Sequence, residues 1–440
     1  MNEVNEVHTD FAILGTGMAG LGAATALAAE GLRPVCYDKN SYPGGHTASW
    51  LSESGFLFDE GPHLSFTRNE RIQDLLAANV DDQYETVGAR INNYWHGYWL
   101  PHPAQCNLYG LRSELITQIV CDFVQAQQPT ERPITDYADW LEAAYGATFA
   151  RTFPMVYGLK YHTTPAENMT TDWLGPRMYR PSLAEVLRGA LSPARQTDMH
   201  YVTTFRYPTR GGFAAYLNPF LAQAQVRLCH RLVSLDPRSR LLRFENGTVA
   251  PYEKLISSMP LPDLIDCIVD VPPQVRDAAG RLAFTSVVLV NLGVDRADLS
   301  ESHITYVYDP EIIFPRLSFP HMLSSHNAPP DTGSIQVEVY FSDKYRPAQC
   351  PPEGLIDPVV DGLRTIGILR DTDQILFSEA RPVRYANVIF DHDRADALAS
   401  VHGFLDEIGV RYCGRYGDWD HSWTDEAFES GERAAHAALA

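Results

Sequence analysis

A glycine-rich turn between an apolar strand and an alanine-rich helix constrains this chain more than any other feature. Residues 10–38 read DFAILGTGMAGLGAATALAAEGLRPVCYD, with the turn written as Gly15-Thr16-Gly17-Met18-Ala19-Gly20. The first glycine permits a tight turn, the second lets a phosphate approach the backbone, and the third lets helix and strand pack closely. The succession of strand, turn and helix therefore predicts a Rossmann-type unit with a pyrophosphate at the N-terminus of the helix.

An acidic residue follows at the position that such a unit uses for a ribose. Gly31 ends the predicted helix, a second strand runs over 34–37, and Asp38 comes 23 positions after Gly15. A carboxylate at this spacing accepts hydrogen bonds from ribose hydroxyls. We therefore expect Asp38, with Lys39 beside it, to bind a dinucleotide cofactor.

Length, charge and cysteine content narrow the class of protein. A chain of 440 residues is too long for one compact core, so two or three domains are expected. The net charge of −20 disfavours nucleic acid and anionic membranes as partners. Apolar runs are too short for a membrane helix, and the polar N-terminus fits no targeting signal. Seven scattered cysteines without a CxxC pair predict neither disulfides nor a metal site, which is typical of a cytoplasmic protein.

The hydrophobic periodicity predicts an α/β protein in which the dinucleotide-binding domain is built from separated segments. Helices are expected at 64–80, 111–125, 135–148, 182–191, 354–369 and 393–408, and alternating strands at 283–294, 303–308, 312–319 and 334–341. Shorter strand-like stretches lie at 226–236, 240–246 and 253–257. The expected division is a Rossmann-type dinucleotide-binding domain from 8–100, 201–264 and 391–440, a helical insertion at 101–200, and an antiparallel-sheet substrate domain at 265–390.

Two further glycine-rich segments indicate which dinucleotide is bound. Tyr42-Pro-Gly44-Gly45-His46 follows the acid, and Asp59-Glu60-Gly61-Pro62-His63 follows a short strand. This succession resembles the flavoprotein group that contains amine oxidases, protoporphyrinogen oxidase and UDP-galactopyranose mutase. The resemblance implies FAD, with the first segment near the ribityl chain and pyrophosphate and the second against the flavin ring.

The carboxy-terminal tail is similar to that of the same group. Residues 411–435 begin as a strand that ends at Gly414-Arg415 and continue as an amphipathic helix. The resemblance implies that Arg415 pairs with the pyrophosphate or with the flavin carbonyls. The cofactor-binding residues expected from all these motifs are Gly15, Gly17, Met18, Ala19, Gly20, Asp38, Lys39, Gly45, His46, Gly61, Pro62, Gly212, Gly414, Arg415 and Asp418.

In the middle of the chain the resemblance narrows to UDP-galactopyranose mutase, particularly its eukaryotic form. Six ordered segments carry it, at 61–70, 98–107, 157–177, 205–212, 306–316 and 384–387. By this resemblance the catalytic residues are His63, Arg177 and Arg316. The substrate-binding residues are Gln105, Tyr157, Lys160, Trp173, Tyr308, Tyr385 and His421.

Several of these residues have a second interpretation. Tyr308 and Tyr385 fit a sheet core, Arg316 fits a structural ion pair, and Lys160 fits either a catalytic amine near the flavin ring or a surface charge. The sequence also departs from the mutase pattern. His421 stands where the family has a tyrosine, and Gly158 and His162 stand where it has the asparagine and tryptophan of the uracil pocket. The base pocket is therefore expected to differ.

The resemblance implies a mutase that interconverts an NDP-pyranose and an NDP-furanose. N5 of reduced FAD would attack the anomeric carbon without net redox change, and NAD(P)H would reduce the flavin beforehand. The alternative is a net-redox FAD-dependent oxidoreductase, amine oxidase-like or desaturase-like, on a small molecule. A nucleotide sugar is the expected partner, and a homodimer is possible.

Overall fold

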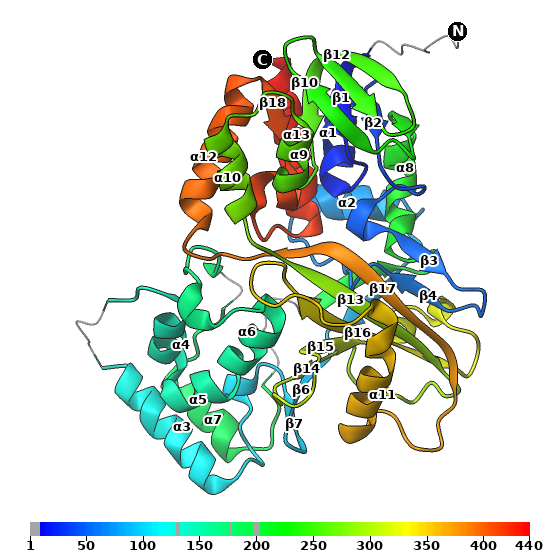
Figure 1. Cartoon of the computed structure of the whole chain (residues 1–440). Coiled ribbons are helices and arrows are strands. Elements are labelled where there is room, and N and C mark those ends of the chain that lie inside the picture. Colours follow the sequence, from blue (N-terminus) through cyan, green and yellow to red (C-terminus); the bar gives the residue numbers. More distant parts are fainter. Residues whose placement is uncertain (1–8, 129–132, 176–177, 197–202) are drawn as a thin grey trace.

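Segments from both halves of the chain form a parallel sheet in the upper part of the molecule (Figure 1), in a computed structural model that describes residues 9–128, 133–175, 178–196 and 203–440. β1 (Thr9–Leu14) lies at the centre, between β2 (Val35–Tyr37) and β12 (Val249–Ser257). β9 (Gln225–Arg227) pairs with β2 and β18 (Val410–Tyr412) with β12, all in parallel. A hairpin of β10 (Leu232–Asp236) and β11 (Leu241–Phe244) joins the start of β12. The Rossmann-type fold predicted from the glycine turn is confirmed.

Successive side chains of β1 point to opposite faces of this sheet, and helices bury them on both faces. Phe11 and Ile13 face one cluster, with α1 (Met18–Ala29) and α13 (Thr424–Leu439). Ala12 and Leu14 face the other, with α9 (Leu261–Cys267), α10 (Pro273–Arg281) and α12 (Arg394–Glu407). A strand covered on both sides reads as a continuous apolar run, which is what the sequence has here.

Glycines let the first and the last helix touch backbone to backbone. A Cβ placed on Gly22 would lie 2.1 Å from the carbonyl oxygen of Phe428, and one on Gly431 would lie 1.9 Å from that of Ala19. No side chain fits at these distances. The tail of the chain is therefore anchored directly on the helix that follows the glycine turn.

A second sheet lies below the first (Figure 1) and has the strand order β17-β13-β16-β15-β14-β6-β7. Its strands are β17 (Ile375–Val388), β13 (Phe284–Val294), β16 (Gly333–Phe341), β15 (Arg316–Ser318), β14 (Ile304–Val307), β6 (Ile91–Trp95) and β7 (Tyr98–Pro101). Val288 and Val290 of β13 face α11 (Ile356–Thr365), whereas Val287 and Leu289 face the parallel sheet.

This sheet differs from the expected one in two respects. β14 pairs with β6 in parallel, so the sheet is not antiparallel throughout. β6 lies N-terminal to the expected boundary at residue 100 and β7 spans it, yet both pair into this sheet, and Tyr94 of β6 is buried in its core. The second sheet therefore draws on the N-terminal segment as well as on residues 284–388.

A helical insertion follows β7 and packs around its own core at the lower left of Figure 1. It contains α3 (Ser113–Ala126), α4 (Tyr137–Tyr145), α5 (Ala147–Thr152), α6 (Pro154–His162) and α7 (Leu183–Leu191). The remaining α-helices and strands are α2 (Glu70–Ala78), α8 (Asn218–Leu221), the pair β3 (Ser49–Leu51) and β4 (Leu57–Asp59), and the pair β5 (Tyr84–Gly88) and β8 (Thr204–Pro208).

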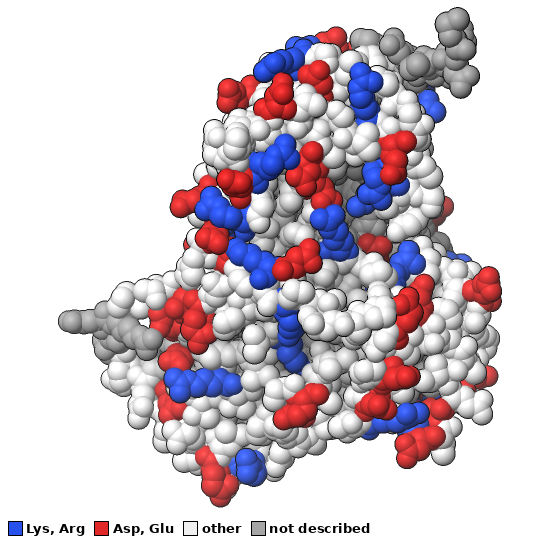
Figure 2. Space-filling view, in the orientation of Figure 1, with Lys and Arg blue, Asp and Glu red and all other residues white. Residues whose placement is uncertain are grey.

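Within the described part of the chain, no helix combines the length and apolarity needed to cross a membrane. Among the described residues in Figure 2, basic and acidic side chains are interspersed on the face shown.

Candidate active site

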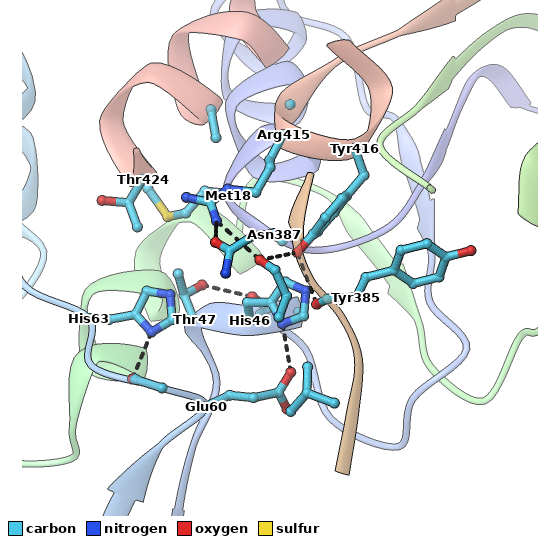
Figure 3. Close-up of a pocket in the computed structure, with 18 of the residues that line it drawn as sticks. Met18, His46, Thr47, Glu60, His63, Tyr385, Asn387, Arg415, Tyr416 and Thr424 are labelled. Carbon is cyan, nitrogen blue, oxygen red and sulfur yellow. Dashed lines mark hydrogen bonds and ion pairs between the residues drawn. The ribbon is translucent and has the colours of Figure 1, made fainter. Parts of the chain in front are cut away.

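A pocket of about 940 Å³ lies between the parallel sheet and the second sheet. Its walls come from the glycine turn, the loops after β2 and β4, the inner face of the second sheet, the end of α6 and the tail. Segments far apart in the sequence therefore meet in this one cavity, part of which Figure 3 shows.

The glycine turn is held in place by the acid that follows β2. Oδ2 of Asp38 accepts hydrogen bonds from the backbone N–H and the hydroxyl of Thr16, at 2.9 and 2.6 Å. Its Oδ1 accepts from the N–H of Asn40 at 2.9 Å. Asp38 is buried and lines the pocket, so one carboxylate orders the turn and faces the cavity.

The first turn of α1 has the features of an anion site. Gly17 caps the helix without a side chain that could accept from the amides that follow. A Cβ on Gly17 would lie 3.7 Å from the carbonyl oxygen of Gly44, so the two glycine turns face each other across a narrow space. Gly44 and Gly45 both have a positive φ, of 108° and 53°. Exposed amides at a helix N-terminus suit a pyrophosphate, and the residues therefore fit a dinucleotide.

The glycine turn, Asp38 and the turn at Gly44 and Gly45 together form what we call the dinucleotide cradle. His46 and His63 stand on the two loops below it (Figure 3). Nδ1 of His46 lies 2.8 Å from Oε1 of Glu60. Nδ1 of His63 lies 2.9 Å from the carbonyl oxygen of Gly61 and must donate, because a carbonyl only accepts. Burial lowers the pKa of His63 to about 4, against the effect of this hydrogen bond. At neutral pH His63 is therefore uncharged, with Nε2 as an acceptor.

The tail reaches the pocket through Gly414 and Arg415. Gly414 has a φ of 76°, and its N–H donates to Ser430 Oγ at 2.9 Å. Arg415 donates to the carbonyl oxygens of Ser422 and Ala386 and to Oδ1 of Asn387 (Figure 3). All these acceptors are neutral, so Arg415 brings a positive charge to the pocket.

A second group of polar side chains lies opposite the dinucleotide cradle. We call it the polar wall; it is centred on Arg316 and also contains Tyr161, Tyr306, Glu338 and Tyr340. Nη2 of Arg316 donates to Oε1 of Glu338 at 2.7 Å, and Nε donates to the other oxygen of the same carboxylate. The hydroxyl of Tyr340 lies 3.4 Å from Nη2, and the ring of Tyr161 lies 5.5 Å from the guanidinium carbon. Burial, with the charge of Glu338, holds the pKa of Tyr340 far above its usual range, so its hydroxyl stays protonated.

The pocket differs in charge from the chain as a whole. Six cationic side chains and five carboxylates line it, whereas the chain carries a net charge of −20. A pocket without excess negative charge can accept an anionic ligand despite the acidic surface.

The pocket brings together fourteen of the expected residues besides His63 and Arg316. These are Gly15, Gly17, Met18, Ala19, Asp38, Lys39, Gly45, His46, Gly61, Pro62, Gly414, Arg415, Tyr385 and His421. The two expected substrate residues in this set, Tyr385 and His421, have side chains that already contact the protein. Tyr385 OH donates to Asp263 Oδ1 at 2.7 Å, and Nε2 of His421 lies 2.9 Å from the carbonyl oxygen of Val388.

Three of the expected cofactor residues lie behind the pocket surface. Gly20 packs on the carbonyl of Gly15, since a Cβ there would lie 2.1 Å from it. Gly212 packs on Ser49 and Asp59 in the same way. Asp418 accepts from Ser430 Oγ at 2.5 Å and so supports Gly414 from behind. These residues shape the loops rather than face the cavity.

The other five expected substrate residues, four in the insertion and Tyr308 after β14, also lie off the pocket surface. Lys160 Nζ donates to three carbonyls, and Tyr308 OH donates to Asn93 Oδ1 at 3.2 Å. Tyr157 packs against the rings of Tyr161, Tyr306 and Tyr308. Trp173 stacks on His421 and donates to Thr170, and Gln105 donates to Tyr179. These partners argue against direct ligand contacts, and Arg177 lies outside the described residues.

Sequence reasoning missed several residues of the polar wall. Tyr161, Tyr306, Glu338 and Tyr340 line the pocket and were not expected there. Glu338 carried a signal, because it is the charged residue of a strand, GSIQVEVYF, in which positions 335, 337 and 339 are apolar and all but the last residue are buried. A buried carboxylate needs a cation or a ligand, which could have identified it.

Comparisons with known proteins match both parts of the chain. Residues 13–78 match the NAD(P)-binding Rossmann-like domain, and residues 148–439, more than half of the chain, match the flavin containing amine oxidoreductase family. A 15-cis-phytoene desaturase from Synechococcus elongatus is 33% identical over 75 residues, which are 17% of this chain and 16% of that protein. A UDP-galactopyranose mutase from Mycoplasma pneumoniae is 30% identical over 96 residues, 21% of this chain and 24% of the relative. The matched segments thus span less than a quarter of these relatives.

Solved structures are similar over nearly the whole chain. A reduced UDP-galactopyranose mutase superposes with a TM-score of 0.91 at 22% identity, covering 98% of this chain and 95% of that one. A putative protoporphyrinogen oxidase from Exiguobacterium sp. 255-15 gives 0.74 at 17% identity, covering 98% and 99%. At these identities the likeness establishes the fold. The family match and the shared fold together show that this chain belongs to the flavin-containing amine oxidoreductase family.

Proposed function

We propose that this protein is an FAD-dependent mutase that interconverts the pyranose and furanose forms of a nucleotide sugar. The observation that carries the proposal is the wall of Arg316, Glu338, Tyr340 and Tyr161, which faces the dinucleotide cradle across one pocket. The match to a UDP-galactopyranose mutase in sequence and the likeness to another in fold support it.

The residues of the cradle would hold FAD along its length. Asp38 would accept from the ribose, the amides after Gly17 would bind the pyrophosphate, and Arg415 would balance negative charge near the flavin. When bound and reduced, FAD would supply a nucleophilic ring nitrogen to the anomeric carbon of the sugar, without net redox change. NAD(P)H is the proposed source of electrons.

The polar wall would anchor the diphosphate of the substrate. Arginine matches phosphate oxygens with a planar set of donors, and tyrosine adds a hydroxyl donor. Glu338 neutralises part of the charge of Arg316 and fixes the plane of its guanidinium. Arg316 would therefore bind and release a diphosphate that leaves the sugar and returns to it.

His63 would act beside the flavin as a neutral group. Its Nδ1–H is committed to Gly61, so Nε2 can accept a hydrogen bond from a ligand in the pocket. Because burial keeps its pKa near 4, this state persists across physiological pH.

Binding of uridine diphosphate to Arg316 variants tests the proposal. Arg316→Ala should lower the affinity at least about 10-fold, because a buried charge-assisted contact is lost. Arg411→Ala, whose half-exposed guanidinium on β18 pairs with Asp406, is the control and should leave it unchanged. Equal affinity of the wild type and Arg316→Ala would remove Arg316 from the substrate site.

A net-redox reaction is the second candidate, and a specific observation favours it. Val287, Leu289 and Val383 form an apolar strip on the same pocket wall, which would accept an apolar substrate. The family description, amine oxidoreductase, points the same way. Such an enzyme would bleach its oxidised flavin when the substrate is added anaerobically, whereas a mutase would not.

A further inference from the structure

Lys160 is a buried cation whose three donors all point at one loop. Its Nζ donates to the carbonyl oxygens of Asp309, Ile312 and Phe314 at 3.0, 3.1 and 2.9 Å. Burial lowers the pKa of Lys160 to about 7, but three carbonyl acceptors match the three N–H groups of an ammonium, so the charged form fits this site and its hydrogen-bonding capacity is filled. The side chain is 6% exposed, and no bond remains for a ligand.

The loop that Lys160 holds joins two strands of the polar wall. Residues 308–315 connect β14 to β15, and Tyr306 and Arg316 face each other across these strands at the base of the loop. Tyr306 and Arg316 both line the pocket. The last carbonyl bound by Lys160, that of Phe314, is two residues from Arg316. The position of this guanidinium therefore depends on the loop.

The same turn of α6 touches the wall a second time. Tyr161, the next residue, lies under the guanidinium of Arg316 and donates from its hydroxyl to Asn387 Oδ1 at 3.2 Å. Nη2 of Arg346 donates to the carbonyl oxygen of Lys160 at 2.6 Å and to that of Tyr340 at 2.9 Å. α6, the loop and β16 are thus tied together around Arg316.

We propose that Lys160 is a positioning residue, which holds the 308–315 loop so that Arg316 presents its guanidinium to the diphosphate of the substrate. The proposal rests on the function proposed above only for the identity of that ligand. It replaces both sequence interpretations of Lys160, since an amine bound to three carbonyls is neither a group beside the flavin nor a surface charge.

A positioning role for Lys160 differs from a general contribution to the stability of the fold, because Lys160 would affect ligand binding through one side chain, that of Arg316. Without the ammonium, buried carbonyls of the loop lose a charged donor, and the loop is free to shift toward water. The cradle for FAD contains no part of this loop. Loss of Lys160 should therefore weaken binding at Arg316 and leave the flavin in place.

The test compares Lys160→Met with Lys254→Met, an exposed lysine on β12, in the FAD-loaded protein. Lys160→Met should keep the FAD content and visible spectrum and should speed amide hydrogen exchange in residues 306–317. It should also weaken uridine diphosphate binding about 10-fold. In the Arg316→Ala background the same substitution should cause no further loss, because both changes remove one contact. Lys254→Met should alter none of these quantities.

Two results would overturn the proposal. One is unchanged hydrogen exchange in 306–317 after Lys160→Met. The other is an equal loss of affinity with and without Arg316, which would mean that Lys160 does not act through it. If the wild type fails to bind uridine diphosphate, the nucleotide part of the proposed function fails, while hydrogen exchange still decides the role of Lys160. If Lys160→Met does not retain FAD, Lys160→Gln, which keeps an N–H donor, takes its place.

Discussion

The hydroxyls of the pocket tyrosines differ in what they already bind. The hydroxyl of Tyr385 donates to Asp263 Oδ1 at 2.7 Å, and the ring of Tyr385 stacks on Phe284 with centroids 4.1 Å apart. The hydroxyl of Tyr340 accepts from Arg316 Nη2 at 3.4 Å and lies beside Glu338. Both hydroxyls therefore have protein partners, but only that of Tyr340 belongs to the Arg316 network at the proposed diphosphate site.

Tyr385→Phe and Tyr340→Phe should consequently behave differently. We expect Tyr385→Phe to change the affinity for uridine diphosphate less than about 2-fold and Tyr340→Phe to lower it about 10-fold or more, because a hydrogen bond to a charged group contributes about 1.5–3 kcal/mol and about 1.4 kcal/mol is tenfold in affinity. Isothermal titration of the two variants measures this. A larger loss in Tyr385→Phe would place its hydroxyl on the ligand.

His162 should make the fold sensitive to acid. It is 4% exposed, its Nδ1 is buried without a partner among the described residues, and burial lowers its pKa to about 3. The unfolded chain takes up this proton near pH 6.5, so the free energy of unfolding should fall as pH drops from about 6.5 toward 3.

His162→Phe should flatten this dependence, because the aromatic cluster with Trp173 can hold a phenyl ring without a titrating group. Melting temperatures between pH 4 and 8 measure it, with the exposed His436→Ala as the control. A His162→Phe protein that loses as much stability in acid as the wild type would show that other groups control it.

Local spacing alone predicts residues whose place is set by the neighbouring backbone, whereas His63 and Arg316 were expected from the family resemblance. Gly15, Gly17 and Asp38 follow from local spacing, and the structure places them around one cradle. The partners of Arg316 could not be read in this way. Glu338 and Tyr161 come from β16 and α6, and only the tertiary fold brings them together.

At the scale of elements, the contact between α1 and α13 excludes any side chain at two glycines. Gly431→Ala would place a Cβ 1.9 Å from the carbonyl of Ala19, so we expect a loss of stability of roughly 1–3 kcal/mol or more. Gly403→Ala in α12, where a Cβ meets nothing within 4 Å, should instead stabilise by about 0.5–1 kcal/mol.

Denaturant unfolding of the two variants gives both values. Because α13 also carries Ser430, which holds Gly414, Gly431→Ala should release FAD more readily as well. Equal stability of Gly431→Ala and Gly403→Ala would mean that the helices separate without cost.

Most elements could be predicted because their periodicity is strong, but β17 was missed. Its 14 residues, ILFSEARPVRYANV, mix charged and apolar positions and include Pro382. Proline disfavours a strand except at a sheet edge, and β17 is the edge strand beside β13. An edge strand that is partly exposed has no apolar run to reveal it, although it carries Tyr385 and Asn387.

At the scale of the whole molecule, the chain closes one pocket with its two ends and places a polar wall opposite. The parallel sheet and tail form the cradle, and the second sheet with α6 forms the wall. Arg415 and Tyr161 both donate to Asn387 and so join the two halves. A cofactor in the cradle and a substrate at the wall would therefore meet in the middle of the pocket.

Turnover by the purified protein with its flavin reduced or oxidised tests the central proposal most directly. Reduced with dithionite under anaerobic conditions, the protein should convert an NDP-pyranose of a small panel to its furanose isomer, seen by chromatography. The oxidised protein and reduced Arg316→Ala should form little product. No furanose from any sugar nucleotide, together with bleaching of the oxidised flavin by an amine or another small molecule, would contradict the proposal and establish net oxidation instead.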